Sequence, residues 1–365
     1  YVSDFDYGST QLFDIYFPAP VNTTFSSVKG ETIITTYNIT SNTTVSYPIT
    51  VPYGVVFNIS SGVTLTINGT FETGLYQVFS GTGTVAFGKY VSVLYPEWFG
   101  AVGDGTTDDI DAFNALINTI YASTSGQMTI KLTNTYKLSN TLTFSSTAGL
   151  SIEGNGCDRA KLIFTNDGVC IKWKDVVWSC IRDVHIYSAT AAVGLFLVRC
   201  SGDYNFSGAN YFENITIYIE SNSSKNNSIG TIGILLYSSE ENTFNASEIW
   251  ADLPVALTTN TQLNVTYEVA SDLSSRNTRT LDLSTYESNL SSIQSCQQNT
   301  FSGESRFICH DTLAPCMEFY GNIGGTIIEN GLFQKRADNG TCDWGIEVNI
   351  STDFIGKIFG IFELG

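Results

Sequence analysis

The chain has 365 residues, 42% of them hydrophobic and 13% aromatic, which is enough to bury a core and excludes a disordered chain. Seventeen Lys and Arg residues against 35 Asp and Glu residues give a net charge of -18, and no basic stripe is present. Neither nucleic acid nor an anionic membrane is therefore an expected partner. No apolar run reaches the roughly 18 residues of a membrane-spanning helix, so no membrane insertion is expected.

The N-terminal part of the chain predicts short strands. Residues 1–50 are interpreted as an N-terminal β-rich segment, broken at Pro18 and Pro20. Residues 51–97 are interpreted as short β coils. There, apolar and polar residues alternate in runs such as Val63 to Ile67, and glycines punctuate the runs.

One amphipathic helix is predicted within residues 98–148, from near Thr107 to near residue 121. Thr106 or Thr107 can cap it, and aspartates occupy its first turn. An apolar stripe runs along it, formed by Ile110, Phe113, Leu116, Ile117 and Ile120. A lone helix among strands needs an apolar partner, and the open end of a β stack supplies one, so we interpret it as a capping helix.

An irregular internal repeat fills residues 149–365. One half of each unit is a polar residue followed by alternating apolar residues, as in Asn214-Ile215-Thr216-Ile217. The other half is a glycine-led apolar strand, as from Gly233 to Leu236. Such units bury their apolar faces only by stacking, which predicts a solenoid with an excursion at about residues 259–297. A leucine-rich repeat lacks its signature here, and a β-sandwich does not require a repeating unit.

A known family is suggested by the motif YPEWFGAVGDGTTDD, which runs from Tyr95 to Asp109. It resembles the opening segment of the pectate-lyase-like superfamily, common in phage tailspikes and in bacterial and viral surface proteins. The resemblance covers roughly residues 51–120. It implies an all-β fold, a right-handed parallel β-helix with one capping α-helix, often within a trimer.

The motif also holds three aspartates, Asp104, Asp108 and Asp109, which raises the question of an active site. We interpret them as structural. Glycines at positions 103 and 105 permit a tight turn, and aspartates suit the unpaired N–H groups at a helix start. In the family that the motif resembles, this segment is likewise the beginning and cap of the β-helix.

The compartment is indicated by fourteen N-x-S/T sequons, more than this composition gives by chance. They predict a glycosylated extracellular or virion-surface protein. The acceptor residues are Asn22, Asn38, Asn42, Asn58, Asn68, Asn205, Asn214, Asn222, Asn226, Asn245, Asn264, Asn289, Asn339 and Asn349.

Eight cysteines support the same compartment and are interpreted as disulfide partners whose pairing the sequence leaves open: Cys157, Cys170, Cys180, Cys200, Cys296, Cys309, Cys316 and Cys342. Cys309 and Cys316 flank a short loop and are the best local pair. The cysteines form no paired CxxC set, and only two histidines, His185 and His310, exist, so neither a metal site nor a cofactor is expected.

The superfamily includes lyases and glycoside hydrolases, but the motifs of its polygalacturonase-like branch are missing, since His310 is not flanked by glycines. The catalytic residues remain unknown. Acidic candidates lie within one rung and the start of the next: Glu240, Glu241, Glu248 and Asp252, then Glu304 with Arg306. Hydrolysis needs two carboxylates about 5–9.5 Å apart across the scissile bond. Trp250 is a candidate for stacking on a sugar, or else it packs on a neighbouring residue.

Two functions from different classes follow. The first is a glycosylated structural protein of a cell or virion surface, a fibre, spike or filament subunit that binds carbohydrate or a receptor. The second is a polysaccharide-degrading hydrolase or lyase like those of tailspikes. Either would place a specific contact in the excursion, through Glu268, Asp272, Arg276, Arg279 and Asp282, unless that segment is a glycosylated loop.

The end of the sequence is still strand-like from Ile358 to Phe362. Because an uncapped β-helix end exposes strand edges, we expect either that the chain continues beyond this point or that this end docks against another subunit. Self-association is expected, as a homo-oligomer such as a trimer or a filament.

Overall fold

A computed structural model of the chain describes these residues: 22–26, 34–155, 160–198, 210–220, 230–269, 272–288, 290, 296–297, 299–303, 305–309, 317–320, 323–335, 346–349 and 355–362. The chain divides into two compact units. Unit 1 comprises residues 1–91, 98–100 and 118–125, and unit 2 comprises residues 92–97, 101–117 and 126–365. Each unit is described by itself.

Unit 1 is a set of parallel β coils in which each coil gives one strand to each of three sheets. Among the described strands of this unit, only β1 pairs antiparallel, with β2. The first sheet contains β1 (Asn22–Ser26), β2 (Ile34–Ile39), β5 (Val55–Ile59) and β8 (Phe79–Gly81); the second contains β3 (Thr43–Val45), β6 (Thr64–Ile67) and β9 (Thr84–Phe87); the third contains β4 (Ile49–Val51) and β7 (Phe71–Thr73). Alternate residues of β3, β4, β5 and β6 are buried, so this unit builds its core from one face of each strand.

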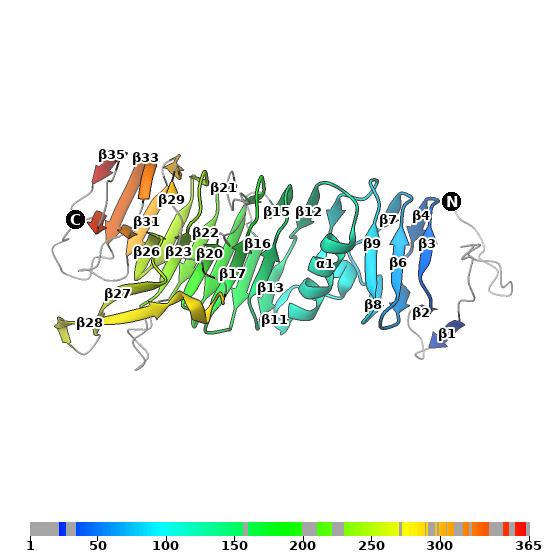
Figure 1. The fold of residues 1–365 in the computed structure, drawn as a ribbon. Coiled ribbons are helices and arrows are strands. Elements are labelled where there is room, and N and C mark those ends of the chain that lie inside the picture. Colours follow the sequence, from blue (N-terminus) through cyan, green and yellow to red (C-terminus); the bar gives the residue numbers. More distant parts are fainter. Residues whose placement is uncertain are drawn as a thin grey trace, which may run out of the picture. The chain divides into compact units, whose positions relative to one another are not determined.

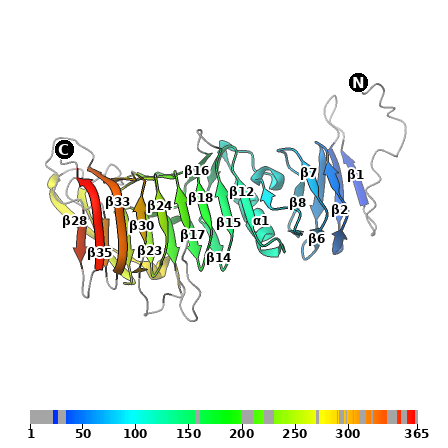
Figure 2. The ribbon, with the colours of Figure 1, turned by 90° about the horizontal axis from the view of Figure 1, so that it is seen from above.

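Unit 2 stacks its strands in two parallel sheets, which we call the long sheet and the short sheet (Figure 2). The long sheet contains β10 (Val93–Leu94), β11 (Asp104–Asp108), β12 (Met128–Lys131), β13 (Thr135–Leu138), β15 (Leu150–Glu153), β16 (Ala160–Phe164), β18 (Cys180–Arg182), β19 (Val184–Ser188), β21 (Tyr211–Glu213), β22 (Thr216–Ile219), β24 (Thr243–Asn245), β25 (Glu248–Ala251), β29 (Cys296–Gln297), β30 (Thr300–Ser302), β31 (Arg306–Cys309), β33 (Ile323–Lys335) and β35 (Ile355–Phe362). The short sheet contains β14 (Leu142–Ser145), β17 (Val169–Lys174), β20 (Val193–Val198), β23 (Ile232–Tyr237), β26 (Leu253–Thr258), β32 (Met317–Tyr320) and β34 (Ile346–Asn349).

Successive turns of unit 2 place like residues above one another. Ile186 of β19 stands beside Ile217 of β22, which stands beside Ile249 of β25, and all three are buried. Parallel pairing between consecutive turns, with apolar columns inside, is the arrangement of a β-helix. The prediction of a right-handed parallel β-helix is confirmed.

The long sheet bends at one residue per turn, and that residue has a left-handed backbone. The bends are at Asp183 (φ 56°), Asn214 (φ 49°), Ala246 (φ 48°) and Gly303 (φ 66°). Asp, Asn and Gly enter this region most easily, which explains their recurrence at the start of each repeat unit. Ala246 is the exception, and its conformation costs about 1–2 kcal/mol.

At the opposite ends of β21, β24 and β30, where the chain enters these strands, buried amide side chains form a second column. Asn210 Nδ2 donates to Asn242 Oδ1 at 2.9 Å, and Asn242 Nδ2 donates to Asn299 Oδ1 at 3.0 Å. All three residues are buried, so the column satisfies polar groups that would otherwise be costly to desolvate.

The outer face of the short sheet is covered by the inserted segment between β26 and β29. The insertion contains the antiparallel pair β27 (Gln262–Val269) and β28 (Asp272–Asp282), followed by the short helix η3 (Leu283–Thr285). Figure 1 shows β27 and β28, in yellow, alongside the green strands of the short sheet. Leu263, Leu281 and Leu283 belong to one buried cluster with Phe196, Leu235 and Ala256 of that sheet. Every residue of β20, β23 and β26 is consequently buried.

An ion-pair cluster joins the end of this insertion to β17. Glu287 accepts from Lys172 Nζ at 3.3 Å and from Lys174 Nζ at 3.1 Å, both on β17. The carboxylate is 5% exposed, so solvent screens these pairs weakly. The backbone oxygen of Tyr286 accepts a further bond from Lys172 Nζ at 3.0 Å.

The single α-helix of the described part, α1 (Ile110–Ala122), begins three residues later than predicted. The Asp104 carboxylate accepts the N–H groups of Thr106 and Thr107, each at 2.7 Å, which holds this segment as strand β11. Asp108, not a threonine, accepts the Ile110 N–H at 3.3 Å. The apolar stripe is as expected, and Phe113 packs edge-on against Tyr136 of β13 with ring centroids 5.2 Å apart.

Three of the eight predicted disulfide cysteines, Cys170, Cys180 and Cys296, are free thiols, so the prediction is wrong for these three. Cys170 and Cys296 are fully buried in unit 2, where burial raises the pKa of the Cys170 thiol and raises that of Cys296 to about 12. The other five side chains, those of Cys157, Cys200, Cys309, Cys316 and Cys342, lie outside the described part, and their pairing stays a prediction. None of the helices among the described residues is long and apolar enough to cross a membrane.

Candidate functional site

An aromatic ladder formed by Tyr187, Tyr218 and Trp250 lies on the outer side of the long sheet. The three residues stand in register on β19, β22 and β25. The Tyr187 and Tyr218 rings are stacked with centroids 5.9 Å apart, and the Tyr218 and Trp250 centroids are 5.7 Å apart at a tilt of 43°. Each ring is half-buried, and the apolar residue before each ring on its strand, Ile186, Ile217 or Ile249, is buried. The ring faces therefore contact one another along the stack.

Charged side chains beside the ladder contact the Tyr187 ring and bind the polar groups of Tyr187 and Trp250. Lys161 Nζ lies 4.5 Å above the centre of the Tyr187 ring, within range of a cation–π interaction. The Tyr187 hydroxyl donates to Glu220, and Trp250 Nε1 donates to Glu248 Oε1 at 2.6 Å. The bond to Glu220, together with burial, raises the pKa of Tyr187 to about 12. The arrangement holds adjacent turns together and offers a mixed aromatic and acidic strip at the surface.

Of the catalytic candidates, Glu248 belongs to this strip and Asp252 is buried. Glu248 is half-buried on β25 and accepts the Trp250 bond, as above. Asp252 is only 2% exposed, and its Oδ2 accepts from Thr231 N at 2.9 Å and from Thr231 Oγ1 at 3.1 Å. A carboxylate so enclosed anchors the start of β26 and is not accessible to a polysaccharide. Glu304 lies outside the described residues.

The remaining predicted site residues are dispersed. Glu240 is half-buried and Glu241 is exposed in the turn before β24, while Arg306 is exposed beside Glu248 in register. In the excursion, Asp282 accepts the Ser284 N–H at 2.9 Å and caps η3. The backbones of Glu268, Asp272, Arg276 and Arg279 lie on β27 and β28, and their side chains are outside the described part. His185 is half-buried on β19, and His310 lies outside the described residues.

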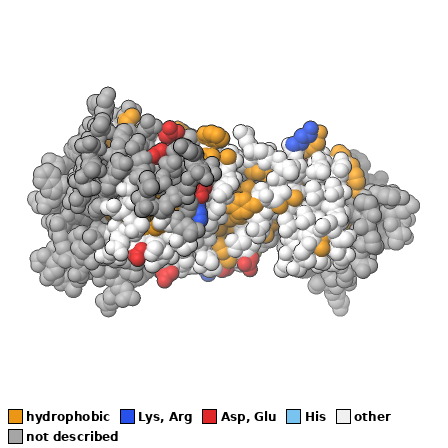
Figure 3. Space-filling model, in the orientation of Figure 1, with side chains coloured by type: hydrophobic (Ala, Val, Ile, Leu, Met, Phe, Trp, Pro, Cys, Tyr) orange, Lys and Arg blue, Asp and Glu red, His pale blue; other side chains and the backbone are white. Residues whose placement is uncertain are grey.

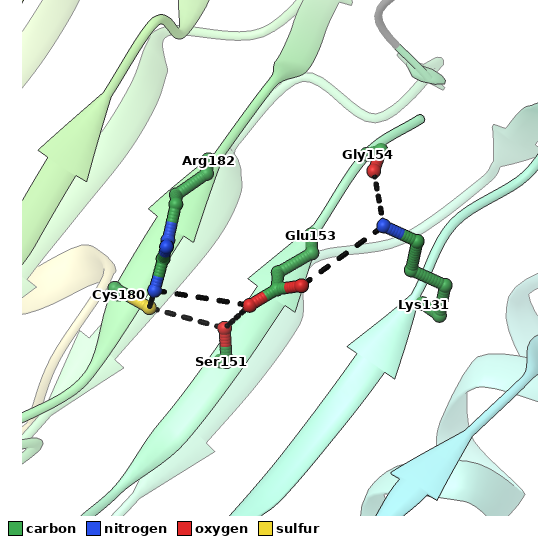
Figure 4. A network of polar contacts seen from close by, with 6 residues as sticks. All are labelled: Lys131, Ser151, Glu153, Gly154, Cys180 and Arg182. Atoms are coloured by element: carbon green, nitrogen blue, oxygen red, sulfur yellow. Dashed lines mark hydrogen bonds and ion pairs between the residues drawn. The ribbon is translucent and has the colours of Figure 1, made fainter. Parts of the chain in front are cut away.

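A second polar column on the long sheet is a charged ladder formed by Lys131, Glu153 and Arg182 (Figure 4). Glu153 lies 3.9 Å from Lys131 Nζ and 3.8 Å from Arg182 Nη2. Ser151 Oγ donates to Glu153 Oε1 at 2.7 Å and lies 3.0 Å from Cys180 Sγ. These side chains are a third to almost half exposed, so they pair with one another at the surface and form no enclosed site.

The motif from Tyr95 to Asp109 serves packing and turn formation, in keeping with our structural interpretation of its aspartates. Asp109 is buried, and its carboxylate accepts the Val102 N–H at 2.7 Å and the Gly103 N–H at 3.2 Å; burial raises its pKa. Glu97 is also buried, and its Oε1 accepts from Tyr136 at 2.6 Å and from Thr133 at 2.7 Å. These carboxylates hold the first turn of unit 2.

In the part of the chain that the structure describes, no three His, Cys, Asp or Glu side chains are grouped so as to hold a metal ion. On the face shown in Figure 3, the coloured Lys and Arg side chains are few and scattered, with acidic side chains among them.

Tyr187, Tyr218, Glu220 and Lys161 were not among the residues predicted from the sequence. A signal was present, because each ladder ring is the fourth residue after a bend residue: Tyr187 after Asp183, Tyr218 after Asn214 and Trp250 after Ala246. Aligning the repeat units on these bends would have placed the three rings in one column. Lys161 and Glu220 have no such signal, since contacts alone join them to the ladder.

No model of a known protein family matches the chain, and no curated protein matches it. Among solved structures, the chain is similar to the periplasmic alginate epimerase AlgG, with 9% sequence identity, a TM-score of 0.35, and coverage of 97% of this chain and 96% of that one. A likeness this distant says nothing about activity, and the β-helix assignment is carried by the strand register itself.

Proposed function

We propose that the chain is an extracellular structural protein, such as a fibre, spike or filament subunit of a cell or virion surface, with its β-helix as the stable scaffold. The observation that carries the proposal is the aromatic ladder. Its rings contact one another, and the Tyr187 hydroxyl and the Trp250 N–H donate to carboxylates of the same strip. Surface groups engaged in this way stabilise the stack of turns.

The state of the candidate carboxylates supports the same role. An endo-acting hydrolase needs an acid and a second carboxylate that both reach the sugar bond. Asp252 is enclosed by Thr231, and Glu248 holds Trp250. A polysaccharide-degrading enzyme like those of tailspikes remains the competing proposal. It requires a catalytic pair that the described residues do not supply at these positions.

The extracellular setting is supported by the sequons, and self-association is part of the same proposal. A subunit of a surface assembly would use its ends or lateral faces to contact other copies. A carbohydrate or receptor contact belongs to the same proposal, with the aromatic ladder as the first place to look.

The test is to secrete the full chain from a eukaryotic cell and to examine it by electron microscopy, light scattering and limited proteolysis. The same sample is incubated with a panel of neutral and uronic-acid polysaccharides, and products are followed by reducing-end and unsaturated-uronate assays. We expect protease-resistant oligomers and no turnover. Turnover that Glu248→Gln abolishes while the oligomer persists would establish the enzyme instead.

A further inference from the structure

Six of the fourteen sequon asparagines have described side chains, and the amide groups of five of them, all but Asn38, fall into two classes. An N-linked sugar is attached to the side-chain nitrogen Nδ2. The surroundings of that nitrogen in the folded protein therefore decide which sequons are compatible with a glycan.

Asn42 and Asn68 are exposed, and in each the carboxamide oxygen faces the protein. Oδ1 of Asn42 accepts the Thr64 N–H at 2.9 Å. Oδ1 of Asn68 lies against Gly88, so close that a Cβ at Gly88 would be 2.7 Å from it. With the oxygen turned inward on an exposed residue, the nitrogen is directed to solvent and has room for a sugar.

Asn58 is different, because its amide lies between two neighbouring turns of unit 1. Its Nδ2 donates to Oδ1 of Asn38 at 2.8 Å, and these two sequon residues stand directly in register. On the other side, Ser80 Oγ donates to Asn58 Oδ1 at 3.5 Å. Adjacent strands are about 4.8 Å apart, and a pyranose ring is wider than that. A sugar on Asn58 would displace Asn38.

Asn214 and Asn245 of unit 2 have the same character. Asn214 is held at a left-handed bend, and its Nδ2 donates to Asp183 Oδ1 at 2.6 Å. Asn245 Nδ2 donates to Glu213 Oε1 at 3.3 Å, and its Oδ1 accepts from Ser302 at 3.3 Å. Both nitrogens donate to carboxylates of the neighbouring turn, and hydrogen bonds to charged acceptors are stronger than those between neutral groups. Both residues are half-buried.

We propose that the folded protein carries N-linked glycans at Asn42 and Asn68 and carries none at Asn58, Asn214 and Asn245. The proposal rests on the extracellular setting proposed above. It has a consequence for the long sheet, since Asn214, at the bend before β22, and Asn245, at the end of β24, are then both bare of sugar.

The experiment uses the full chain secreted from a eukaryotic cell, with intact mass spectrometry as the readout. Asn42→Gln and Asn68→Gln should each lower the mass by one glycan. Ser60→Ala and Thr216→Val destroy the sequons of Asn58 and Asn214 while leaving both asparagine amides in place, and should remove no glycan. Glycosidase treatment in heavy-oxygen water, followed by peptide mapping, should label positions 42 and 68 and leave position 245 as asparagine.

Loss of a glycan in Ser60→Ala or in Thr216→Val, or heavy-oxygen label at position 245, would overturn the assignment. Unchanged mass in both Asn→Gln variants would overturn it too. These failures are separate from failure of the proposed function. An unglycosylated chain that forms inert, protease-resistant oligomers contradicts only the glycan assignment, whereas a glycosylated chain that degrades a polysaccharide contradicts only the structural role.

Discussion

The two sheets of unit 2 are built from the same repeat and meet different surroundings. Strands of the long sheet, such as β16 and β19, alternate between buried and half-buried residues. Strands of the short sheet, such as β20 and β23, are buried at every residue, because the chain's own insertion covers their outer face. One outer face is thus a solvated surface with ladders of paired side chains, and the other is a second hydrophobic core over β20, β23 and β26.

Two glutamates make this contrast concrete. Glu287, on the covered side, bridges Lys172 and Lys174 and is 5% exposed. Glu153, on the open side, bridges Lys131 and Arg182 and is 31% exposed. The two clusters contain the same kinds of charged groups. The difference between their contributions to the free energy of unfolding therefore measures the effect of burial by the insertion.

The largest effect is expected where the cover packs on the short sheet. Leu283 is fully buried in the cluster with Phe196 and Leu235. Leu283→Ala removes that packing and leaves a cavity, which should lower the free energy of unfolding by about 3–4 kcal/mol. Urea denaturation followed by circular dichroism measures it. Val102→Ala, at a residue 54% exposed, is the control and should change stability little. Equal losses of stability in the two variants would show that the insertion does not pack on the short sheet through Leu283.

The buried ion pairs come next. Glu287→Ala leaves two partly buried ammonium groups without their carboxylate, and we expect a loss of about 2–3 kcal/mol, somewhat below that of a fully buried pair. The same urea titration applies. High salt should change the difference between this variant and the wild type only slightly, and a difference that vanishes in salt would mean that the cluster is solvated.

The aromatic ladder should contribute less. Tyr218→Ala removes the middle ring and both of its contacts, to Tyr187 and Trp250. Because aromatic pairs contribute about 0.5–1.5 kcal/mol beyond burial, we expect a loss of about 2 kcal/mol. A double-mutant cycle with Trp250→Ala should show positive coupling, and strictly additive losses would rule out the ladder as a unit.

The open-side glutamate gives the matched small effect. Glu153→Ala should lower stability by about 0.5 kcal/mol, since exposed ion pairs contribute little and salt screens them. Measured beside Glu287→Ala under identical conditions, it should differ from that variant several-fold. Similar values for the two would erase the distinction between the faces.

The Tyr187 hydroxyl makes a small part of the stability depend on pH. The bond to Glu220 raises the pKa of Tyr187 from 10.0 to about 12. The folded state therefore holds this proton more tightly than the unfolded state. The contribution of the Tyr187–Glu220 bond to the free energy of unfolding is consequently complete below pH 10 and is lost as the pH rises through 12. Ultraviolet titration of the wild type minus Tyr187→Phe should give a tyrosinate midpoint near 12. A midpoint near 10 would show that the bond is absent.

Much of the fold could be predicted from particular residues. Alternation in Asn214-Ile215-Thr216-Ile217 placed the isoleucines inside, where Ile215 and Ile217 are fully buried. The helix was found from its apolar stripe, but its start was misplaced by three residues. The reason is that the Asp104 carboxylate binds the N–H groups of Thr106 and Thr107 before a helix can form.

The candidate site could be predicted less well. Asp252 was proposed as a catalytic carboxylate, but Thr231, 21 residues earlier in the chain, encloses it. Trp250 was recognised as either a sugar platform or a packing residue, and Tyr218 accounts for its packing. Such outcomes depend on which turns of the β-helix become neighbours, which no short sequence window contains.

The sequence by itself determined the class of fold, because the period of its apolar residues and its glycines and bend residues are local properties of the chain. It also determined the continuous apolar runs of the short sheet. Only the tertiary structure decided what covers those runs, which rings stack, and which amide nitrogens are already engaged. These depend on register between turns that lie about 20 to 60 residues apart, where the free energy of packing selects one alignment.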